Sequence, residues 1–479
     1  MKIFILIASS IFALAAFITT YLFQVTIGTV LFTFLYILIF LNGIYLKSDK
    51  EKVDIFRPYF LVSILLYLYS LAGIFYVNIT GTTLYGDFVS DKSLTIFIWA
   101  SLLTQFGISL GFLLQTRNFP TTIKVNSNDT KINDSEERYL LFFGFILSIA
   151  FSFFIYKNFL PSEAVSYAEW SLQSRLDRSQ TNTSGISEIV LVTTPTILLI
   201  CSLIHILFSY KYNFLLRVFS FLIIFLYLYT QLLSGARANL MITIILLATY
   251  INYKVYKFKF FEILLGGSFV YVSINLISLI RITSDPAEMI FLLFDQFSLS
   301  GLSFLSLERS SELLTSLNAL TIIQGIAIGE QDFLYGKLFI QQILGFIPGF
   351  IWPGRPDFAS VLYVKSFYPG IYESGGGFGF SVVAEGFWEF GLIGCILYGF
   401  LTGLVGEKVY QLFTPYKDRP MFIFLYALIF TRIVLLVHRS GLIASMKAAL
   451  ILSIPILFVI VIYKTIKILK NENEDSLDA

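Results

Sequence analysis

Five arginines stand out in this chain, because charged side chains are scarce in a sequence that is 57% hydrophobic and 13% charged. A guanidinium group stays ionised and binds phosphate oxygens through two parallel N–H bonds. Arginines gathered at one membrane face therefore predict a site for a phosphate or diphosphate group. A single arginine can instead anchor its helix by reaching the lipid headgroups. The five are Arg237, Arg281, Arg355, Arg432 and Arg439.

Two of these arginines lie beside glycines that would let a ligand or another chain segment come close. Arg237 lies two residues after Gly235, and Arg439 lies two residues before Gly441. We therefore favour ligand binding over headgroup anchoring most strongly for these two. Arg432 is predicted to lie in the same helix as Arg439, nearly two turns deeper in the membrane. At that depth a charged side chain needs a carboxylate or a ligand as partner.

Candidates for proton transfer accompany the arginines. Glu385 and Glu389 are four residues apart and share one face of a predicted helix. Burial favours the protonated form of a carboxyl group, which suits a base that takes a proton from a sugar hydroxyl. We expect Glu385 about two turns below the outer surface, as that base or in an ion pair with Arg432 or another outer arginine. His438 is the second candidate base, with a capping or interfacial role as its alternative.

Apolar stretches long enough to cross a bilayer must position these side chains. Soluble domains carry about 25% charged residues, so a chain with 13% is predicted to be an all-α polytopic membrane protein. We expect the first span to remain uncleaved, although the N-terminal segment also resembles a signal peptide. We expect about twelve transmembrane helices, at 3–22, 26–46, 59–79, 94–115, 139–157, 187–209, 214–232, 237–253, 260–281, 378–405, 420–437 and 441–463.

Lysine and arginine in the short loops predict the orientation. With both termini in the cytoplasm, the cation-rich loops all fall on the cytoplasmic side. The five arginines then lie at or below the periplasmic or external face. The cytoplasmic cations are Lys47, Lys50, Lys52, Arg57, Arg117, Lys124, Lys131, Arg138, Lys211, Lys254, Lys257, Lys259, Lys408, Lys417, Arg419, Lys464, Lys467 and Lys470.

One large loop is expected on the outer face. The predicted divisions are membrane helices one to nine in 1–281, the loop in 282–377, helices ten to twelve in 378–463 and a cytoplasmic tail in 464–479. Within the loop, 289–307 and 317–328 are predicted to form interfacial or re-entrant helices. An extra pair of spans is the alternative. The run Gly375-Gly376-Gly377-Phe378-Gly379 predicts a hinge, although backbone amides at a helix start can also bind a diphosphate.

Several classes of function are disfavoured. A net charge of +2 gives no indication of nucleic-acid binding. Cys201 and Cys395 lie in apolar segments without a partner at metal or redox spacing, and we interpret them as core residues. The first outer loop, near Tyr21–Val25, lacks the acidic residue that metal-dependent glycosyltransferases carry there. We expect neither a metal nor another cofactor.

The chain resembles the Wzy-type oligosaccharide repeat-unit polymerases, which make O-antigen or capsule. The resemblance rests on the order of spans, on one large outer loop late in the chain, and on three local motifs. The motifs are Ser234-Gly235-Ala236-Arg237, the segment Phe350-Ile351-Trp352-Pro353-Gly354-Arg355-Pro356, and the run SVVAEGFWEFGLIG at 381–394. It implies a GT-C-like glycosyltransferase architecture in the bacterial cytoplasmic (inner) membrane.

The resemblance also implies a reaction and its partners. Donor and acceptor would be glycans on undecaprenyl pyrophosphate, and a hydroxyl of the acceptor would attack the donor's anomeric carbon. The arginines would stabilise the leaving pyrophosphate, and Glu385 or His438 would take the proton. A chain-length regulator and a flippase would be neighbours. Loop aromatics would stack on sugars or form an interfacial belt; they are Trp352, Tyr363, Phe367, Tyr368 and Tyr372.

Three other functions stay open at the level of sequence. An O-antigen ligase shares the twelve-span plan and differs in its acceptor. A flippase or transporter of the lipid-linked unit would place charges through the spans and lack a large outer loop, and this chain shows the opposite pattern. A purely structural or sensor role is the third.

Overall fold

The fold is known from a computed structural model, which describes 27–45, 54–83, 87–117, 146, 194–233, 237–263, 265–267, 313–347, 351–352, 354–373 and 377–477. Across these residues the secondary structure is helical, apart from two isolated β-bridges. Five of the described helices are long and apolar enough to cross a membrane, within Pro58–Thr80, Asp91–Gln115, Phe214–Gln231, Val382–Tyr416 and Leu442–Ile462. The prediction of an all-α protein with membrane-spanning helices is therefore confirmed.

Nine of the predicted spans overlap described helices closely. These are α2 (Ile27–Tyr45), α3 (Pro58–Thr80), α4 (Asp91–Arg117), α9 (Thr194–Phe208), α10 (Phe214–Leu233), α11 (Arg237–Lys254), α18 (Val382–Phe413), α19 (Pro420–Phe430) with its continuation, and α21 (Leu442–Leu477). The span at 3–22 lies outside the described residues, as does 139–157 except for Ile146, and 260–281 is described only in part. The count of twelve spans stays a prediction.

The helix ends follow ordinary local chemistry. Pro58 and Pro420 stand at the first positions of α3 and α19, where no intrahelical N–H is needed. Gly81 ends α3 with φ +72°, and its N–H donates to the carbonyl of Val77. A left-handed residue at this place is the usual glycine C-cap.

Among the described helices, α4 and α18 form the most extensive contact, and glycines make this contact possible. A Cβ atom on Gly107 or Gly111 of α4 would lie 2.3 Å and 2.1 Å from backbone carbonyl oxygens of α18. A Cβ atom on Gly399 or Gly403 of α18 would lie 2.2 Å and 2.1 Å from carbonyl oxygens of α4. Both helices thus carry a Gly-x-x-x-Gly pair at the contact, the arrangement that lets helix backbones approach in membranes.

Buried polar groups tie the neighbouring helices to this pair. The Tyr36 hydroxyl donates to Gln105 Oε1 at 2.8 Å, and Gln105 Nε2 donates to Ser63 Oγ at 3.0 Å, which joins α2, α4 and α3. At the start of α3, Arg57 is ion-paired with Glu407 of α18. These bonds satisfy groups that would otherwise be costly to bury.

The helix α18 is two arms rather than one continuous span. Phe390 (φ −139°, ψ 24°) and Gly391 (φ +62°, ψ −141°) interrupt it. A Cβ atom on Gly394 would lie 1.9 Å from the carbonyl oxygen of Gly386, although residues eight apart in a straight helix are about 12 Å apart. The short arm, 382–389, therefore folds back on the long arm, 392–413. The predicted span at 378–405 is broken at this point.

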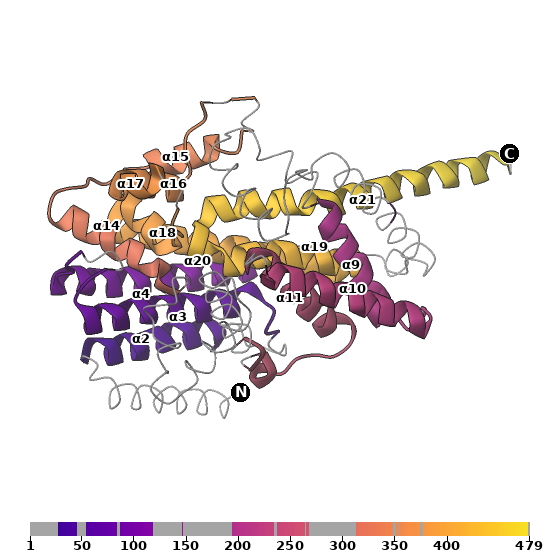
Figure 1. Ribbon diagram of the computed structural model, residues 1–479, viewed down its shortest axis with the longest axis horizontal. Coiled ribbons are helices and arrows are strands. Elements are labelled where there is room, and N and C mark those ends of the chain that lie inside the picture. Colours follow the sequence, from indigo (N-terminus) through magenta and orange to yellow (C-terminus); the bar gives the residue numbers. More distant parts are fainter. Residues whose placement is uncertain are drawn as a thin grey trace.

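The helices of the large loop gather at one end of the molecule, and the C-terminal part of α21 extends toward the opposite end (Figure 1). They are α14 (Leu317–Ala327), α15 (Lys337–Leu344), α16 (Ala359–Phe367) and α17 (Pro369–Glu373). The predicted segment 317–328 becomes α14, and most of its residues are buried against α4 and α18. It packs inside the protein and does not lie on its surface. The segment 289–307 is outside the described residues.

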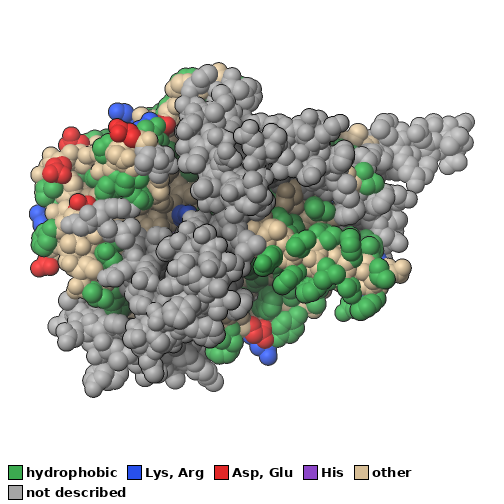
Figure 2. All heavy atoms as spheres, viewed as in Figure 1, with side chains coloured by type: hydrophobic (Ala, Val, Ile, Leu, Met, Phe, Trp, Pro, Cys, Tyr) green, Lys and Arg blue, Asp and Glu red, His purple; other side chains and the backbone are tan. Residues whose placement is uncertain are grey.

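The visible surface separates charged from apolar regions. Acidic and basic side chains surround the end formed by α14–α17, whereas a broad hydrophobic area covers the end with α9–α11 (Figure 2). On α10, large apolar side chains such as Phe214, Leu215 and Phe225 are 75%, 79% and 60% exposed. Such a surface suits contact with lipid.

Adding a methyl group at the α4–α18 contact tests its importance. We expect Gly399→Ala to destabilise the protein by about 1–3 kcal/mol, because its Cβ would meet the carbonyl oxygen of Thr104 and force the helices apart. Gly370→Ala is the matched control, since no atom lies within 4 Å of its added Cβ. Thermal unfolding of the purified proteins in detergent is the measurement, and equal midpoints for the two variants would contradict the role given to this contact.

Candidate functional site

Glu385 lies on the short arm of α18 and is fully buried. Ser381 starts the arm as its N-cap, with Oγ accepting a bond from the N–H of Ala384 at 3.2 Å. One carboxylate oxygen of Glu385 accepts from Gln342 Nε2 at 2.6 Å, and the other accepts from the N–H of Leu442 at 2.6 Å. Since Leu442 is the first residue of α21, the carboxylate caps the positive end of that helix.

Gly441 makes this cap possible. Its φ of +76° is unfavourable for other residues, and a Cβ atom there would lie 2.7 Å from Oε2 of Glu385. The sequence suggested that Gly441 lets a ligand or another chain segment come close. In the structure, the space beside it is taken by the carboxylate of Glu385.

Glu389 caps the N-terminus of α15 (Lys337–Leu344) in the same way. Its two carboxylate oxygens accept bonds from the N–H groups of Gly336 and Phe339, the N-cap and third residue of that helix. At the other end of α15, the ammonium group of Lys447 donates to the carbonyl of Gly345. An anion at the N-terminus and a cation at the C-terminus both stabilise the helix dipole. Together with Gln342, these contacts fix the loop helix α15 to α18 and α21.

His438 is completely buried in α20 (Val437–Ser440). Its Nε2–H donates to the carbonyl oxygen of Val62 at 3.0 Å, so Nδ1 carries the free lone pair of a neutral ring. No hydrogen-bond partner of Nδ1 is present among the described residues. Burial lowers the pKa of His438 to about 4, so the ring is neutral at physiological pH. It is arranged as a proton acceptor.

Arg432 lies in η6 (Thr431–Leu435), a π-helical turn that continues α19. Such turns are frequent at functional sites. The Nε–H of Arg432 is buried and meets no hydrogen-bond acceptor in the described part of the chain. The ion pair expected with Glu385 is not formed, because the carboxylate of Glu385 bonds to Gln342 and Leu442 instead. The guanidinium charge is therefore not neutralised by that carboxylate.

Arg439 is half-buried beside the segment that leads into α18. Its carbonyl oxygen accepts a bond from the N–H of Phe380, and its Cγ lies 3.1 Å from where a Cβ atom on Gly379 would be. The Gly379 carbonyl also accepts from the amide of Asn318. At Gly379 the glycine-rich segment is thus held in place, in contrast to the expected hinge; residues 374–376 are outside the described part.

The structure brings some of the predicted site residues together. Glu385 contacts Gly441 and Leu442, which directly follow the α20 helix that carries His438 and Arg439. Arg432 is in η6, and its neighbour Ile433 lies 3.9 Å from where a Cβ atom on Gly406 would be, in the long arm of α18. Arg355 lies elsewhere, near the C-terminal end of α15, where its Nη1–H donates to the carbonyl oxygen of Ile347 at 3.1 Å. Arg237 is the first residue of α11, and its side chain is not described. Arg281 lies outside the described residues.

Sequence reasoning missed Gln342 and Lys447. Gln342 is a fully buried amide in the large loop, and Lys447 is a cation inside a predicted span. The second could have been found, because an ionisable residue within a membrane span is itself a sign of function. Within the described residues, no group of three or more His, Cys, Asp or Glu side chains is placed to hold a metal ion.

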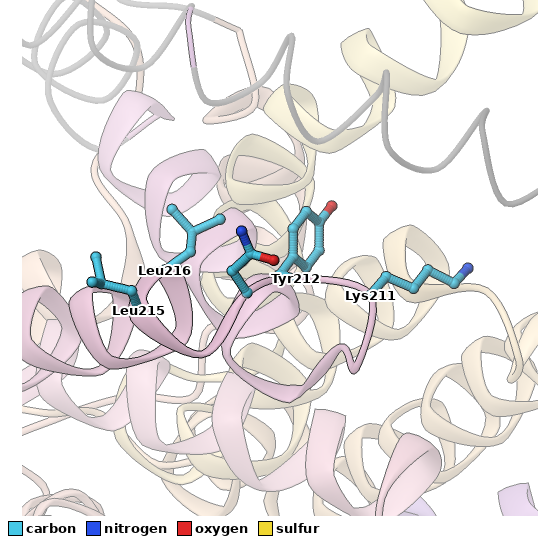
Figure 3. Close-up of a pocket in the computed structure, with 5 residues that line it drawn as sticks. Lys211, Tyr212, Leu215 and Leu216 are labelled. Carbon is cyan, nitrogen blue, oxygen red and sulfur yellow. The ribbon is translucent and has the colours of Figure 1, made fainter.

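A surface pocket lies away from these residues. It is formed by Lys211, Tyr212, Asn213, Leu215 and Leu216 at the turn between α9 and α10 (Figure 3). In the close-up, the side chain of Lys211 extends away from Leu215 and Leu216. The pocket contains none of the acids, bases or arginines discussed above, so it is not part of the candidate site.

Comparison with known proteins gives a family over nearly the whole chain. The family model described as O-antigen polysaccharide polymerase Wzy matches residues 5–473. No curated protein and no solved structure matches the chain.

The cap at Gly441 can be tested with a matched glycine. We expect Gly441→Ala to destabilise the protein more than Gly391→Ala, by about 1–3 kcal/mol. Both glycines combine a positive φ with an extended ψ, 173° at Gly441 and −141° at Gly391, so both variants carry similar backbone strain. At Gly391 the atom nearest the new Cβ is 3.4 Å away, an ordinary contact, whereas at Gly441 the new Cβ would collide with Glu385. Thermal unfolding checks this, and equal losses for the two variants would mean that the carboxylate cap contributes little.

Proposed function

The chain belongs to the O-antigen polysaccharide polymerase Wzy family, and from this premise we propose that it joins lipid-linked oligosaccharide repeat units into a polysaccharide. Family membership makes it a glycosyltransferase-type polymerase, and its apolar helices are those of an integral membrane protein. In our proposal it lies in the bacterial cytoplasmic membrane with both termini inside and acts at the outer face. A flippase that delivers the units and a chain-length regulator are its proposed neighbours.

The proposed reaction is a substitution at an anomeric carbon. The donor is the growing glycan on undecaprenyl pyrophosphate, and the acceptor is a single repeat unit on a second undecaprenyl pyrophosphate. A hydroxyl oxygen of the acceptor forms the new glycosidic bond while the bond from the anomeric carbon to the diphosphate oxygen breaks. The electron pair leaves with the diphosphate, and the hydroxyl proton passes to a base on the protein.

The observation that carries the proposal is the buried Nε–H of Arg432, which has no hydrogen-bond acceptor among the described residues. A buried cationic group without a partner is costly unless an anionic ligand neutralises it. The leaving diphosphate gains negative charge in the transition state, so a fixed cation beside it lowers the barrier. Arg439, one residue after the candidate base, is the second proposed contact. Arg237 and Arg281 remain proposed ligands of the leaving diphosphate from the sequence pattern, and Arg355 remains a proposed ligand of a substrate diphosphate.

His438 is the better supported base. Its Nδ1 lone pair has no partner among the described residues, whereas both oxygens of Glu385 already accept hydrogen bonds. We therefore propose that His438 takes the hydroxyl proton and that Glu385 positions the start of α21 and the loop helix α15. With arginines to stabilise the leaving group, the reaction proceeds without a metal, and extension by the purified protein is expected to survive EDTA.

A glycan profile tests the function and the role of Arg432 together. A strain lacking the gene should carry surface glycan reduced to a single repeat unit, with single-unit lipid intermediates. Wild-type protein should restore polymer, and Arg432→Ala should not, because loss of a transition-state contact costs about 100-fold to 1,000-fold in rate. Arg419→Ala is the matched control, at the opposite end of α19. Lipid-linked polymer that accumulates without transfer would instead indicate a ligase.

The identity of the base can be read from the pH dependence of extension by the purified protein. With His438 as base, the rate should fall as pH decreases through about 4, because protonation of the ring removes its lone pair. His438→Ala should lose about 100-fold or more. Glu385→Gln should stay within about tenfold of wild type, since an amide keeps the size and an acceptor oxygen of the cap. If the His438→Ala variant extends glycan at the wild-type rate and the Glu385→Gln variant is inactive, Glu385 is the base and His438 is not.

A further inference from the structure

Two cations from distant parts of the chain converge on the C-terminal end of α15. Lys447 of α21 donates to the carbonyl of Gly345, and Arg355 donates to the carbonyl of Ile347, only two residues further along. The positive charge of Arg355 acts repulsively on Lys447. Phe358 lies beneath the ammonium group, which is 4.7 Å from the ring centroid. Like charges held together in this way favour an anion as a third partner.

No acidic side chain neutralises this pair in the described part of the chain. Asp357, the acidic residue next to Arg355 in sequence, is ion-paired with Lys365. Glu385 and Glu389 cap α21 and α15. The carbonyls at the end of α15 supply roughly half a negative charge at most, against two full positive charges. A net positive charge remains where α15 meets α21.

Both cations have more N–H donors than the described residues provide acceptors for. A guanidinium has five N–H donors and an ammonium has three. For each of Arg355 and Lys447, the described residues provide one backbone carbonyl as acceptor. Lys447 also lies within the first turns of the candidate span Leu442–Ile462, where an ionisable residue is expensive and is a sign of function. The remaining donors suit the several oxygens of a phosphate or diphosphate.

This pair is separate from the arginines proposed to bind the leaving group. Arg432 and Arg439 precede Gly441, on η6 and α20, whereas Lys447 follows it on α21. Glu385 contacts the segment that joins the two groups, because it caps Leu442, and it also bonds to Gln342 in the middle of α15. A polymerase must hold two lipid diphosphates at once, and only that of the donor leaves during the reaction.

We propose that Arg355 and Lys447 form a second anion site, which binds the diphosphate of the lipid-linked acceptor. The proposal rests on the function proposed above. The acceptor's diphosphate keeps its charge throughout the reaction, so this site contributes binding that is equal in the ground and transition states. Loss of such an interaction raises KM and leaves kcat unchanged. Loss of a leaving-group contact lowers kcat.

Binding stoichiometry tests the site without any need for polymerisation. The probe is farnesyl diphosphate, added to the full chain in nanodiscs of phosphatidylcholine. We expect two molecules bound per wild-type chain, and one in Lys447→Gln or in Arg355→Gln, with affinity at the lost site reduced about tenfold or more. Arg432→Gln should lose the other molecule. Lys365→Gln, a cation of the same loop paired with Asp357, should bind two.

Three outcomes overturn the proposal. Wild-type protein that binds one farnesyl diphosphate has no second site, and Lys447→Gln and Arg355→Gln variants that still bind two place that site elsewhere. If wild-type protein binds only one farnesyl diphosphate once the nanodiscs contain anionic phosphatidylglycerol, that lipid has displaced the second molecule. The occupant of the site would then be a bulk phospholipid headgroup. Because Lys447 also supports α15, melting temperatures are compared, and Lys447→Arg, which keeps the charge, should bind two.

Steady-state extension gives an independent readout. With lipid-linked repeat unit extracted from the strain lacking the gene as the varied substrate, Lys447→Gln should raise KM about tenfold and leave kcat unchanged. An equal fall in kcat would overturn the acceptor assignment. If the strain lacking the gene still makes polymer, the proposed polymerase function fails, while the stoichiometry experiment still reports whether the anion site exists.

Discussion

The need to supply hydrogen-bond donors to two carboxylates shapes the centre of this protein. Glu385 and Glu389 are both fully buried, where an unpaired carboxylate would be very unfavourable. Each is satisfied by the N-terminus of a different helix, α21 for Glu385 and α15 for Glu389. The last long helix and the large loop are thereby joined to the short arm of α18. Any residue that acts on substrate near α15, α20 or α21 depends on these two caps for its position.

The short arm can present the carboxylates in this way only because the long arm of α18 is fixed. The glycines at the α4–α18 contact let the two backbones touch, and a backbone contact leaves less freedom than one made through flexible side chains. The reversal at Phe390 and Gly391 then turns the short arm back toward α15 and α21. The membrane helices thus carry the loop helices, and Glu385 and His438 both lie near helix ends.

Sequence patterns predicted these helices well where an apolar run ends at proline, glycine or charge, as for α3, α4 and α10. They also singled out Glu385, His438 and Arg432. They did not predict the break in α18, because Phe390 and Gly391 lie within an apolar run that a straight helix fits equally well. They could not assign partners either. The bond from Gln342 to Glu385 spans 43 residues, and only the folded chain shows that Gly441 makes room for a carboxylate.

The partners of Glu385 decide what the arginines can do. Had Glu385 formed the expected ion pair with Arg432, the two charges would have cancelled, and the guanidinium would attract a diphosphate only weakly. Backbone N–H groups and a neutral amide satisfy the carboxylate instead, so they stabilise its charge without using a cation. In our proposal, the positive charge of Arg432 therefore stays available to the diphosphate. A buried acid close to a proposed anion site is therefore consistent with anion binding, because helix dipoles rather than arginines neutralise that acid.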